Sequence, residues 1–323
     1  MRKYLDRRLK LQMLRIADAI DTQGSILKAA AALGMSQPAV TKSLQELEEI
    51  TQARLFDRHA KGVRVTAAGS RLIGSGRRIL AEVVRLDDDL DQLARPEGGL
   101  VAVGALPVAA TGILPGVLIR LRRQYPDIQV RLQQGRTEEL LPMLASGELD
   151  MIVGRLYKPA RPDGLVRETL WAEPISILAR SDHPIFGGPC PDQEAIRRYE
   201  LVLPTVTQRV GQEIEHVLAQ LHLEPTSSLR SNSYGFIREM LHGTDVLSAM
   251  PRLMMVGDLL RGTLKVVPLP METPERPAGL ILSRVANVSA ASAAFVDCMR
   301  EYIAQISSQG LMARMDVQAL TAA

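Results

Sequence analysis

The residues best suited to chemistry in this chain form a short polar run near the N-terminus. Ser36, Gln37, Thr41 and Gln45 carry hydrogen-bonding side chains, and Lys42 adds a positive charge. Hydroxyl and amide groups can read base edges in the DNA major groove, and lysine can reach a phosphate. The run therefore predicts a nucleic-acid contact, provided that a helix presents these side chains on one side.

The flanking residues predict two short helices separated by a tight break. Gly24 ends a preceding helix, and Gly34 supplies the positive backbone angle of a sharp turn. Ser36 is a good N-cap, and Pro38 is tolerated in the first turn of the helix that follows. The inward stripe of that helix is Val40, Leu44 and Leu47, and its outward residues are Gln37, Ala39, Thr41, Lys42 and Gln45. This is a helix-turn-helix pattern, in which the N-terminal residues of the second helix contact bases.

A second basic element follows between Arg54 and Gly69. A Lys61-Gly62 turn separates two short extended pieces that carry Arg58, Lys61 and Arg64, which predicts a hairpin wing along the DNA backbone or minor groove. Residues 1–78 hold 15 Lys/Arg against 7 Asp/Glu, a balance of +8, whereas the remaining residues hold 24 against 29, a balance of −5. The alternative is a chance cluster of arginines on a solvated face; the wing and the turn together favour DNA binding.

The stretches AAALGMSQPAVTKSLQELEE and RLFDRHAKGVRVTAAG resemble the N-terminal signature of the LysR-type transcriptional regulators. The most specific matching residues are Ala29, Ala30, Ser36, Gln37, Pro38, Ala39, Leu47, Glu48, Leu55, Phe56, Arg58, Thr66 and Gly69. The resemblance continues from about Leu9 to about Gln305. One departure is visible, because Thr51 and Gln52 stand where the family usually has Leu-Gly, so no glycine cap can end the helix there.

A long helix is predicted after the wing, from Ala67 to about Ala94, with Thr66 as its cap. Its heptad positions are Leu72, Ile79, Leu86 and Leu93 in one set and Val83 and Leu90 in the other. Apolar spacing sustained over this length favours pairing with the same helix of a second chain, hence a homodimer. The alternative is one amphipathic helix packed on its own domain.

Strands and helices alternate beyond the Pro/Gly boundary at 94–99, which implies an α/β fold with parallel strands covered on both faces. We expect three parts: a winged helix-turn-helix domain at 1–66, a linker helix at 67–95 and an effector-binding domain at 96–323. The last resembles periplasmic binding proteins, with lobe I at about 96–160 and 268–310 and lobe II at about 161–267. A ligand would lie in the cleft between them.

The family resemblance implies that a small-molecule inducer binds in this cleft. The closest likeness, carried by GELDMIVGRL and LVRETLWAEPISILARSDHP, is to members that respond to aromatic-acid breakdown products or sugars. By position, the inducer contacts are Leu106, Pro107, Val108, Arg136, Thr137, Pro204, Thr205, Val206 and Thr207. Threonine hydroxyls can bind a carboxylate or a sugar hydroxyl, although each can equally serve as a helix cap. For Arg155 we favour a structural role between the lobes over a ligand contact.

The resemblance further implies double-stranded DNA with a dyad-symmetric promoter site, a second copy of the chain, a tetramer and RNA polymerase as partners. No apolar run approaches the ~18–20 residues of a membrane span. Only Cys190 and Cys298 are present, and no signal peptide is apparent, so a bacterial cytoplasmic protein is expected.

An enzyme is not expected, and neither is a cofactor or metal. The five histidines show no metal-ligand spacing, and the sequence contains no Gly-x-Ser-x-Gly elbow, phosphate-binding loop or dinucleotide fingerprint. The sequence thus predicts an inducer-controlled DNA-binding regulator. The rival is a solute-binding protein whose N-terminal helices mediate only assembly.

Overall fold

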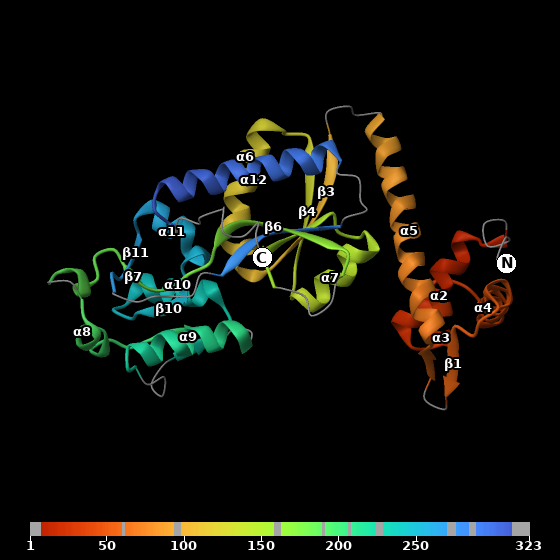
Figure 1. The fold of residues 1–323 in the computed structure, drawn as a ribbon, viewed down its shortest axis with the longest axis horizontal. Coiled ribbons are helices and arrows are strands. Elements are labelled where there is room, and N and C mark those ends of the chain that lie inside the picture. Colours follow the sequence, from red (N-terminus) through yellow and green to blue (C-terminus); the bar gives the residue numbers. More distant parts are fainter. Residues whose placement is uncertain are drawn as a thin grey trace. The chain divides into compact units, whose positions relative to one another are not determined.

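The computed structural model describes residues 8–59, 62–93, 98–157, 163–188, 191–205, 208–223, 229–269, 276–283 and 289–311. The chain folds into two compact units. One comprises Met1–Gly99 with Leu141–Leu149, and the other comprises Leu100–Leu140 with Asp150–Ala323. Each unit is described by itself below (Figure 1).

The N-terminal unit begins with the helices α2 (Leu11–Gln23), α3 (Ile26–Ala32) and α4 (Gln37–Thr51). Gly24 ends α2 with φ 61°, and Gly34, with φ 64°, makes the turn before α4. Glycine adopts such angles without the strain that a side chain would add. The Ser36 hydroxyl accepts a hydrogen bond from the Ala39 N–H at 3.4 Å, and Pro38 lies in the first turn. The predicted helix-turn-helix geometry is confirmed.

The end of α4 uses a left-handed cap although no glycine is present. Gln52 adopts φ 50° and ψ 37°, and its N–H donates to the carbonyls of Glu48 and Glu49. The helix therefore ends without a glycine cap, as expected, and a glutamine adopts the left-handed conformation instead. Any strain at Gln52 is offset locally, because the Glu48 carboxylate accepts from the N–H groups of Leu55 (2.7 Å) and Phe56 (3.3 Å) just beyond it.

The wing is a two-stranded antiparallel hairpin, β1 (Phe56–His59) and β2 (Gly62–Val65). Gly69 shows why its position excludes a side chain: a Cβ there would lie 2.1 Å from the Leu55 carbonyl oxygen. Thr66 donates to the Arg54 carbonyl at 2.7 Å and accepts from the Gly69 N–H at 3.0 Å, so it caps the next helix as predicted. These motif residues hold the wing against the helix that follows.

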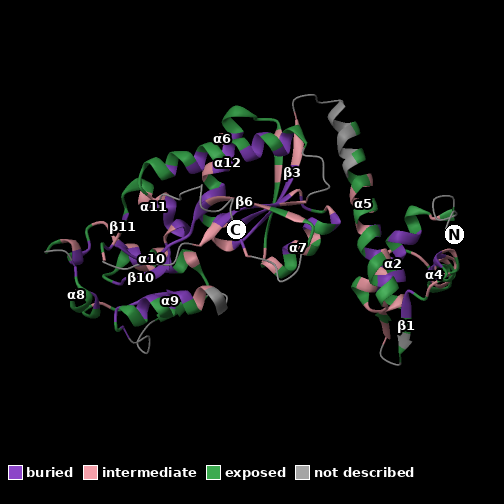
Figure 2. Ribbon diagram, viewed as in Figure 1, coloured by how far each residue is buried: buried purple, intermediate pink, exposed green. Residues whose placement is uncertain are grey.

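The long helix α5 runs from Ala67 to Leu93, which confirms its prediction. Its first half packs on α2, where Arg77 binds Asp18 at 2.6 Å and Asp21 at 3.0 Å. Its second half leaves apolar side chains uncovered by its own unit: Ile79, Val84, Leu86 and Leu90 are 42–57% exposed. Figure 2 colours exposed residues along α5 in green. These exposed apolar side chains count against the alternative of one amphipathic helix packed on its own domain.

The second unit contains two sheets. The first joins five strands in the order β4 (Ile128–Gln134), β3 (Gly99–Ala105), β5 (Met151–Arg155), β12 (Pro277–Ser283) and β6 (Leu165–Ala172). The helical segments of this unit beside the sheet are η1 (Ala109–Ile113), α6 (Leu114–Gln124) and α12 (Ala290–Ser308). The helix α7 (Thr137–Ser146) begins in this unit, and its residues from Leu141 onward are counted with the first. α6 and α12 pack together and share a buried core with the strands of the sheet (Figure 1).

The second sheet joins β10 (Ser248–Pro251), β7 (Ile175–Arg180) and β11 (Leu264–Val266), and a bridge between Leu201 and Leu247 adds the parallel pair β8 (Val202–Pro204) and β9 (Leu229–Ser231). Its helical segments are η2 (Pro184–Phe186), α8 (Gln193–Arg197), α9 (Gln208–Gln220), α10 (Tyr234–Gly243), η4 (Arg252–Met255) and α11 (Val256–Arg261). Two lobes with two crossovers are thus present.

Two details of the sequence prediction need correction. The first sheet is mixed rather than parallel, because β12 runs antiparallel to both β5 and β6. The second lobe does not begin near residue 161: β6 pairs with β12 in the first sheet, and the crossover lies after it, at Glu173 and Pro174. The alternating β6 sequence could pair in either lobe, and only the return of β12 provides its partner. No helix in the described part of the chain is long and apolar enough to span a bilayer.

Candidate nucleic-acid interface and effector domain

The polar run singled out in the sequence lies on the open side of α4. Ser36, Gln37, Pro38, Ala39, Lys42 and Gln45 are exposed, and Thr41 is half-buried. On the opposite side Val40, Leu44 and Leu47 are buried in the core shared by α2 and α3. Because the inward stripe anchors α4, the N-terminal end of the helix is free to enter a groove. The structure therefore brings all seven predicted α4 residues onto one accessible surface.

The wing places its basic residues on a paired scaffold. Arg64 is exposed on β2 and pairs with Asp57 of β1, and Arg58 lies opposite Val63. Lys61 lies outside the described residues. Gly62 fixes how the wing meets the helices, because a Cβ there would lie 2.6 Å from the Gly24 carbonyl oxygen, the same oxygen that accepts from the Val63 N–H at 3.1 Å.

The predicted inducer-contacting residues of lobe I lie together beyond two neighbouring strands. Leu106 is buried after β3, with Pro107 and Val108 half-buried, and the Leu106 N–H donates to Val153 of β5 at 2.9 Å. The Gly135 N–H donates to the Ala105 carbonyl at 3.2 Å. This bond brings the loop that carries Arg136 and Thr137 next to the end of β3. Arg136 is exposed and Thr137 is half-buried.

The predicted lobe II residues follow β8. Pro204 is buried and pairs with Ser231, and Thr205 is exposed with its N–H donating to the Ser231 carbonyl at 2.7 Å. Val206 and Thr207 lie outside the described residues. Between Thr205 and the lobe I loops, no hydrogen bond or ion pair occurs among the residues that the structure describes.

Arg155 lies at the junction of the lobes and has two carboxylate partners. Its Nη1 lies 2.8 Å from Glu213 Oε2, and its Nε lies 3.4 Å from Glu173 Oε2. Arg276 adds a contact of 3.2 Å to Glu213 Oε1. Burial lowers the pKa of Arg155, but the two carboxylates outweigh it and raise that pKa; burial also raises the pKa of Glu173. The structural role expected for Arg155 agrees with this geometry.

The sequence reading missed the partners of Arg155. Glu173 precedes Pro174 at one crossover, Arg276 precedes strand β12 at the other, and Glu213 lies on α9 of lobe II. A charged residue beside a crossover proline was the only available signal for Glu173, and nothing in the local pattern around Glu213 marks it as buried. Tertiary folding alone joins them.

Two family descriptions match the chain. Residues 11–70 match the bacterial regulatory helix-turn-helix protein of the lysR family, and residues 94–304 match the LysR substrate binding domain. The chain is 26% identical over 299 residues to the HTH-type transcriptional regulator PcaQ of Agrobacterium fabrum, covering 92% of this chain and 96% of that protein. It is 28% identical over 294 residues to the HTH-type transcriptional regulator YdcI of Escherichia coli, covering 91% and 96%.

Solved structures share the fold. A cysteine variant of full-length OxyR from Pseudomonas aeruginosa matches with a TM-score of 0.60 and 20% identity, over 95% of this chain and 99% of that one. Full-length CbnR complexed with its target DNA also matches with a TM-score of 0.60 and 20% identity, over 91% and 100%. These identities establish fold similarity.

The curated relatives are transcriptional regulators and not enzymes, and the helix-turn-helix family match rules out the rival reading of the N-terminal helices as assembly elements only. A DNA-reading helix with a wing is joined in one chain to a two-lobe α/β domain of the substrate-binding type. The protein is therefore a DNA-binding transcriptional regulator with an effector-binding domain, and it belongs to the LysR family.

Proposed function

We propose that the regulator reads a dyad-symmetric promoter site through the exposed end of α4 and its wing. The base-facing and phosphate-facing residues are Ser36, Gln37, Pro38, Ala39, Thr41, Lys42, Gln45, Arg58, Lys61 and Arg64. The observation that carries the proposal is the row of exposed polar side chains on α4, opposite its buried stripe. This is the side of a recognition helix that faces base edges.

A homodimer formed through α5 doubles this surface. Its exposed apolar side chains Ile79, Leu86 and Leu90 follow the heptad spacing and need a cover that their own unit does not supply. A dimer carries two DNA-binding domains, and binding of the first raises the effective concentration of the second at the DNA, which raises the affinity. The distance between the two domains also selects the spacing of the half-sites. We further propose that the homodimers form a tetramer, that the protein contacts RNA polymerase, and that it acts in the cytoplasm.

Control of the DNA-binding domain (1–66, with linker 67–95) comes from the effector-binding domain at 96–323. An inducer, a small carboxylate or a sugar, binds between the lobes at the loops of 106–108, 136–137 and 204–207. The adjacency of the first two loops supports a shared site. Binding closes the lobes, and closure changes the relative placement of the paired winged helices and hence the bend or register of the DNA.

Selection from a random duplex library tests the proposal without knowledge of the operator. The full chain should enrich a motif with two inverted half-sites, and affinity for that motif should fall steeply with salt, as phosphate contacts require. Enrichment of no motif at any ionic strength, with or without small carboxylates and sugars, would contradict the proposed DNA readout. A single half-site without symmetry would contradict the dimer.

A further inference from the structure

Buried polar atoms without hydrogen-bond partners gather where the two lobes join. Eight such side-chain atoms occur in the described part of the chain, and six belong to residues at or beside the crossovers. They are Arg155 Nε and Nη2, Trp171 Nε1, Glu173 Oε1, Arg252 Nε and Arg276 Nε. Arg155, Trp171 and Glu173 interact with one another and Arg276 faces Glu213, whereas the Arg252 side chain has no polar partner among the described residues. Buried polar groups normally have partners, so Arg252 is the member for which a partner is to be supplied.

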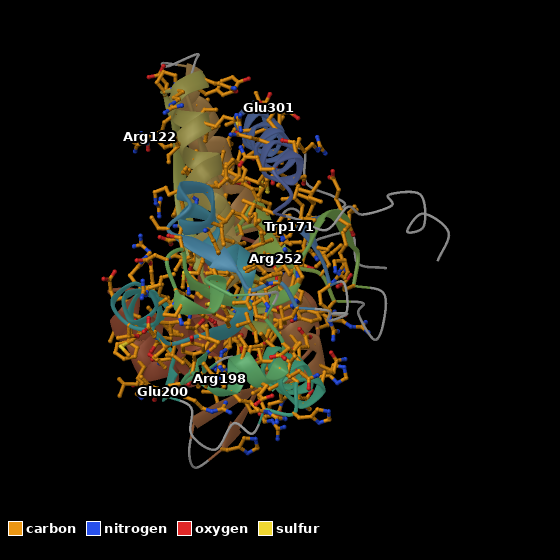
Figure 3. The ribbon with its side chains drawn as sticks, turned by 90° about the vertical axis from the view of Figure 1, so that its left-hand side faces the viewer. Arg122, Trp171, Arg198, Glu200, Arg252 and Glu301 are labelled. Carbon is orange, nitrogen blue, oxygen red and sulfur yellow. The ribbon has the colours of Figure 1, made fainter. Side chains whose placement is uncertain are left out.

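Backbone hydrogen bonds tie these residues to one another. The Glu173 N–H donates to the Arg276 carbonyl at 2.9 Å, and the Arg252 N–H donates to the Pro174 carbonyl at 3.3 Å. In the sheet, Ala278 pairs with Arg155 on one side and with Trp171 on the other. Figure 3 shows Trp171 and Arg252 in the middle of the second unit in that view, with Arg198 well apart from them. The cluster is thus one local feature, which we call the crossover cluster: Arg155, Trp171, Glu173, Glu213, Arg252 and Arg276.

The crossover cluster carries more positive than negative charge. It contains three guanidinium groups and two carboxylates, and the carboxylates already face Arg155 and Arg276. Arg252 is half-buried, and no carboxylate lies within ion-pair distance of it among the described residues. Burial lowers the pKa of Arg252 with no opposing charge to raise it. A desolvated arginine without a counter-charge is costly, because guanidinium does not lose its proton in proteins.

The backbone of Arg252 lies at the contact between the lobes. It begins η4, which follows β10 of lobe II, yet Leu253 and Val256 belong to the buried core of lobe I. A Cβ on Gly112 of η1 would lie 1.8 Å from the Leu253 carbonyl oxygen, so η1 and η4 touch backbone to backbone. A negatively charged group bound to Arg252 would therefore contact the segment that connects the two lobes.

We propose that Arg252 binds the carboxylate, or an equivalent oxyanion, of the effector. The guanidinium supplies paired N–H donors in the geometry that carboxylates accept, and the excess positive charge of the crossover cluster attracts an anionic ligand more strongly than a neutral one. Of the two inducer classes considered above, the structure thus favours the acid over the neutral sugar. This inference rests on the proposed function, since it takes the second domain to bind an effector; it adds the charge of that effector and the residue that recognises it.

A thermal-shift and Trp171 fluorescence titration of the full chain tests the inference. The oxyanion probes are succinate, benzoate and inorganic phosphate, and the neutral probe is galactose. Benzoate is used in the thermal-shift measurement only. At least one oxyanion should give a saturable increase in Tm. Arg252→Gln should weaken its apparent affinity by about tenfold or more, because a charge-assisted hydrogen bond is lost, and Arg252→Lys should fall between. Arg198→Gln, an exposed arginine of lobe II, should match the wild type.

The ligand-free variants provide an independent readout. Arg252→Gln should leave Tm unchanged or raise it, because an unpaired half-buried charge is removed. A fall in Tm without ligand would mean that Arg252 already has a partner in the protein, and it would overturn the inference. So would an oxyanion affinity that Arg252→Gln leaves unchanged, no saturable shift with any oxyanion, or a shift with galactose alone. DNA binding of the wild type and of the control Arg198→Gln in the absence of effector reports the proposed function separately, so a failure of DNA readout in both proteins would count against the proposed function instead.

Discussion

Some residues of the DNA-binding domain hold its helices and wing in place, and others are exposed and available to contact DNA. Glu48 accepts two backbone N–H groups at the start of the wing, and Gly69 is where a side chain would meet the Leu55 carbonyl. Their roles are structural although they belong to the family motif. Gln37 makes no such contact and is exposed, so its identity is free to serve recognition.

Replacing Gln37 with alanine should relax base preference. An amide that reads a base edge contributes about 1–3 kcal/mol of discrimination at the base pair it contacts. Arg58→Ala should instead weaken binding to all sequences alike, because phosphate contacts carry no sequence information. Binding of both variants to the selected motif and to its single-base changes measures the difference. Glu49→Ala, exposed near the far end of α4, is the control. Equal losses of affinity and preference in both variants would contradict the assigned roles.

Two glycines of α5 should respond to alanine in opposite directions. Gly69→Ala should lower the free energy of unfolding by about 3 kcal/mol, because its Cβ would lie 2.1 Å from a backbone oxygen. Gly74→Ala should raise it by about 0.5–1 kcal/mol, since nothing lies within 4 Å and alanine is the better helix former. Chemical denaturation followed by circular dichroism compares them. Similar effects of the two substitutions would show that contact with Leu55 is not what restricts position 69.

At the scale of elements, α11 is fixed to α10 by one buried carboxylate. Asp258 accepts from Arg238 at 2.9 Å, from Arg261 at 3.0 Å and from His242 at 3.2 Å, and only 6% of its side chain is exposed. Burial would raise the pKa of Asp258, but these hydrogen bonds outweigh burial and lower it to about 2. The short helix α11 is therefore held by charge as well as by apolar contacts.

Replacing Asp258 with asparagine should cost about 2 kcal/mol of stability at neutral pH. The folded pKa lies below the unfolded value, so the stabilisation is present above about pH 4 and is lost as the pH falls toward 2. The difference between wild type and Asp258→Asn in urea unfolding should shrink over that interval. Glu200→Gln, an exposed carboxylate of the same lobe, should show no such difference. A gap between the two proteins that stays constant down to pH 2 would disprove the assignment.

At the scale of the whole molecule, the two lobes of the effector domain are joined by backbone crossovers and by buried charge. Glu213 of lobe II reaches Arg155 and Arg276, which lie at the ends of lobe I strands. Removing one partner of a buried ion pair lowers stability more than replacing the whole pair with apolar residues does, because the remaining charge is left buried and uncompensated. This network holds the lobes in register while leaving Arg252 without a counter-charge.

Glu213→Gln should therefore lower the stability of the effector domain by about 3 kcal/mol. Glu215→Gln, two residues along α9 and exposed, should change it by less than about 0.5 kcal/mol. Trp171 is the single tryptophan of the chain and is buried, so its fluorescence reports unfolding of this domain. If both substitutions prove equally mild, the contacts of Glu213 contribute little to joining the lobes.

The sequence by itself determined the local elements and which polar side chains of α4 are exposed. Turn glycines, the Ser36 cap and the apolar stripe of α4 act within a few residues of one another, so their pattern fixes which side chains face outward. The heptads of α5 likewise predicted the exposed apolar row. Local signals have this power because helices are periodic and caps are short-range.

Only the tertiary structure decided which strands share a sheet and which charges meet. β6 joined the first sheet because β12 returns beside it from more than a hundred residues away, and no pattern within β6 specifies that partner. Arg155, Glu173, Glu213 and Arg276 are separated in sequence, and their pairing follows from the placement of two crossovers and one helix. The same placement leaves Arg252 uncompensated, because burial and charge balance are properties of the assembled fold rather than of any segment.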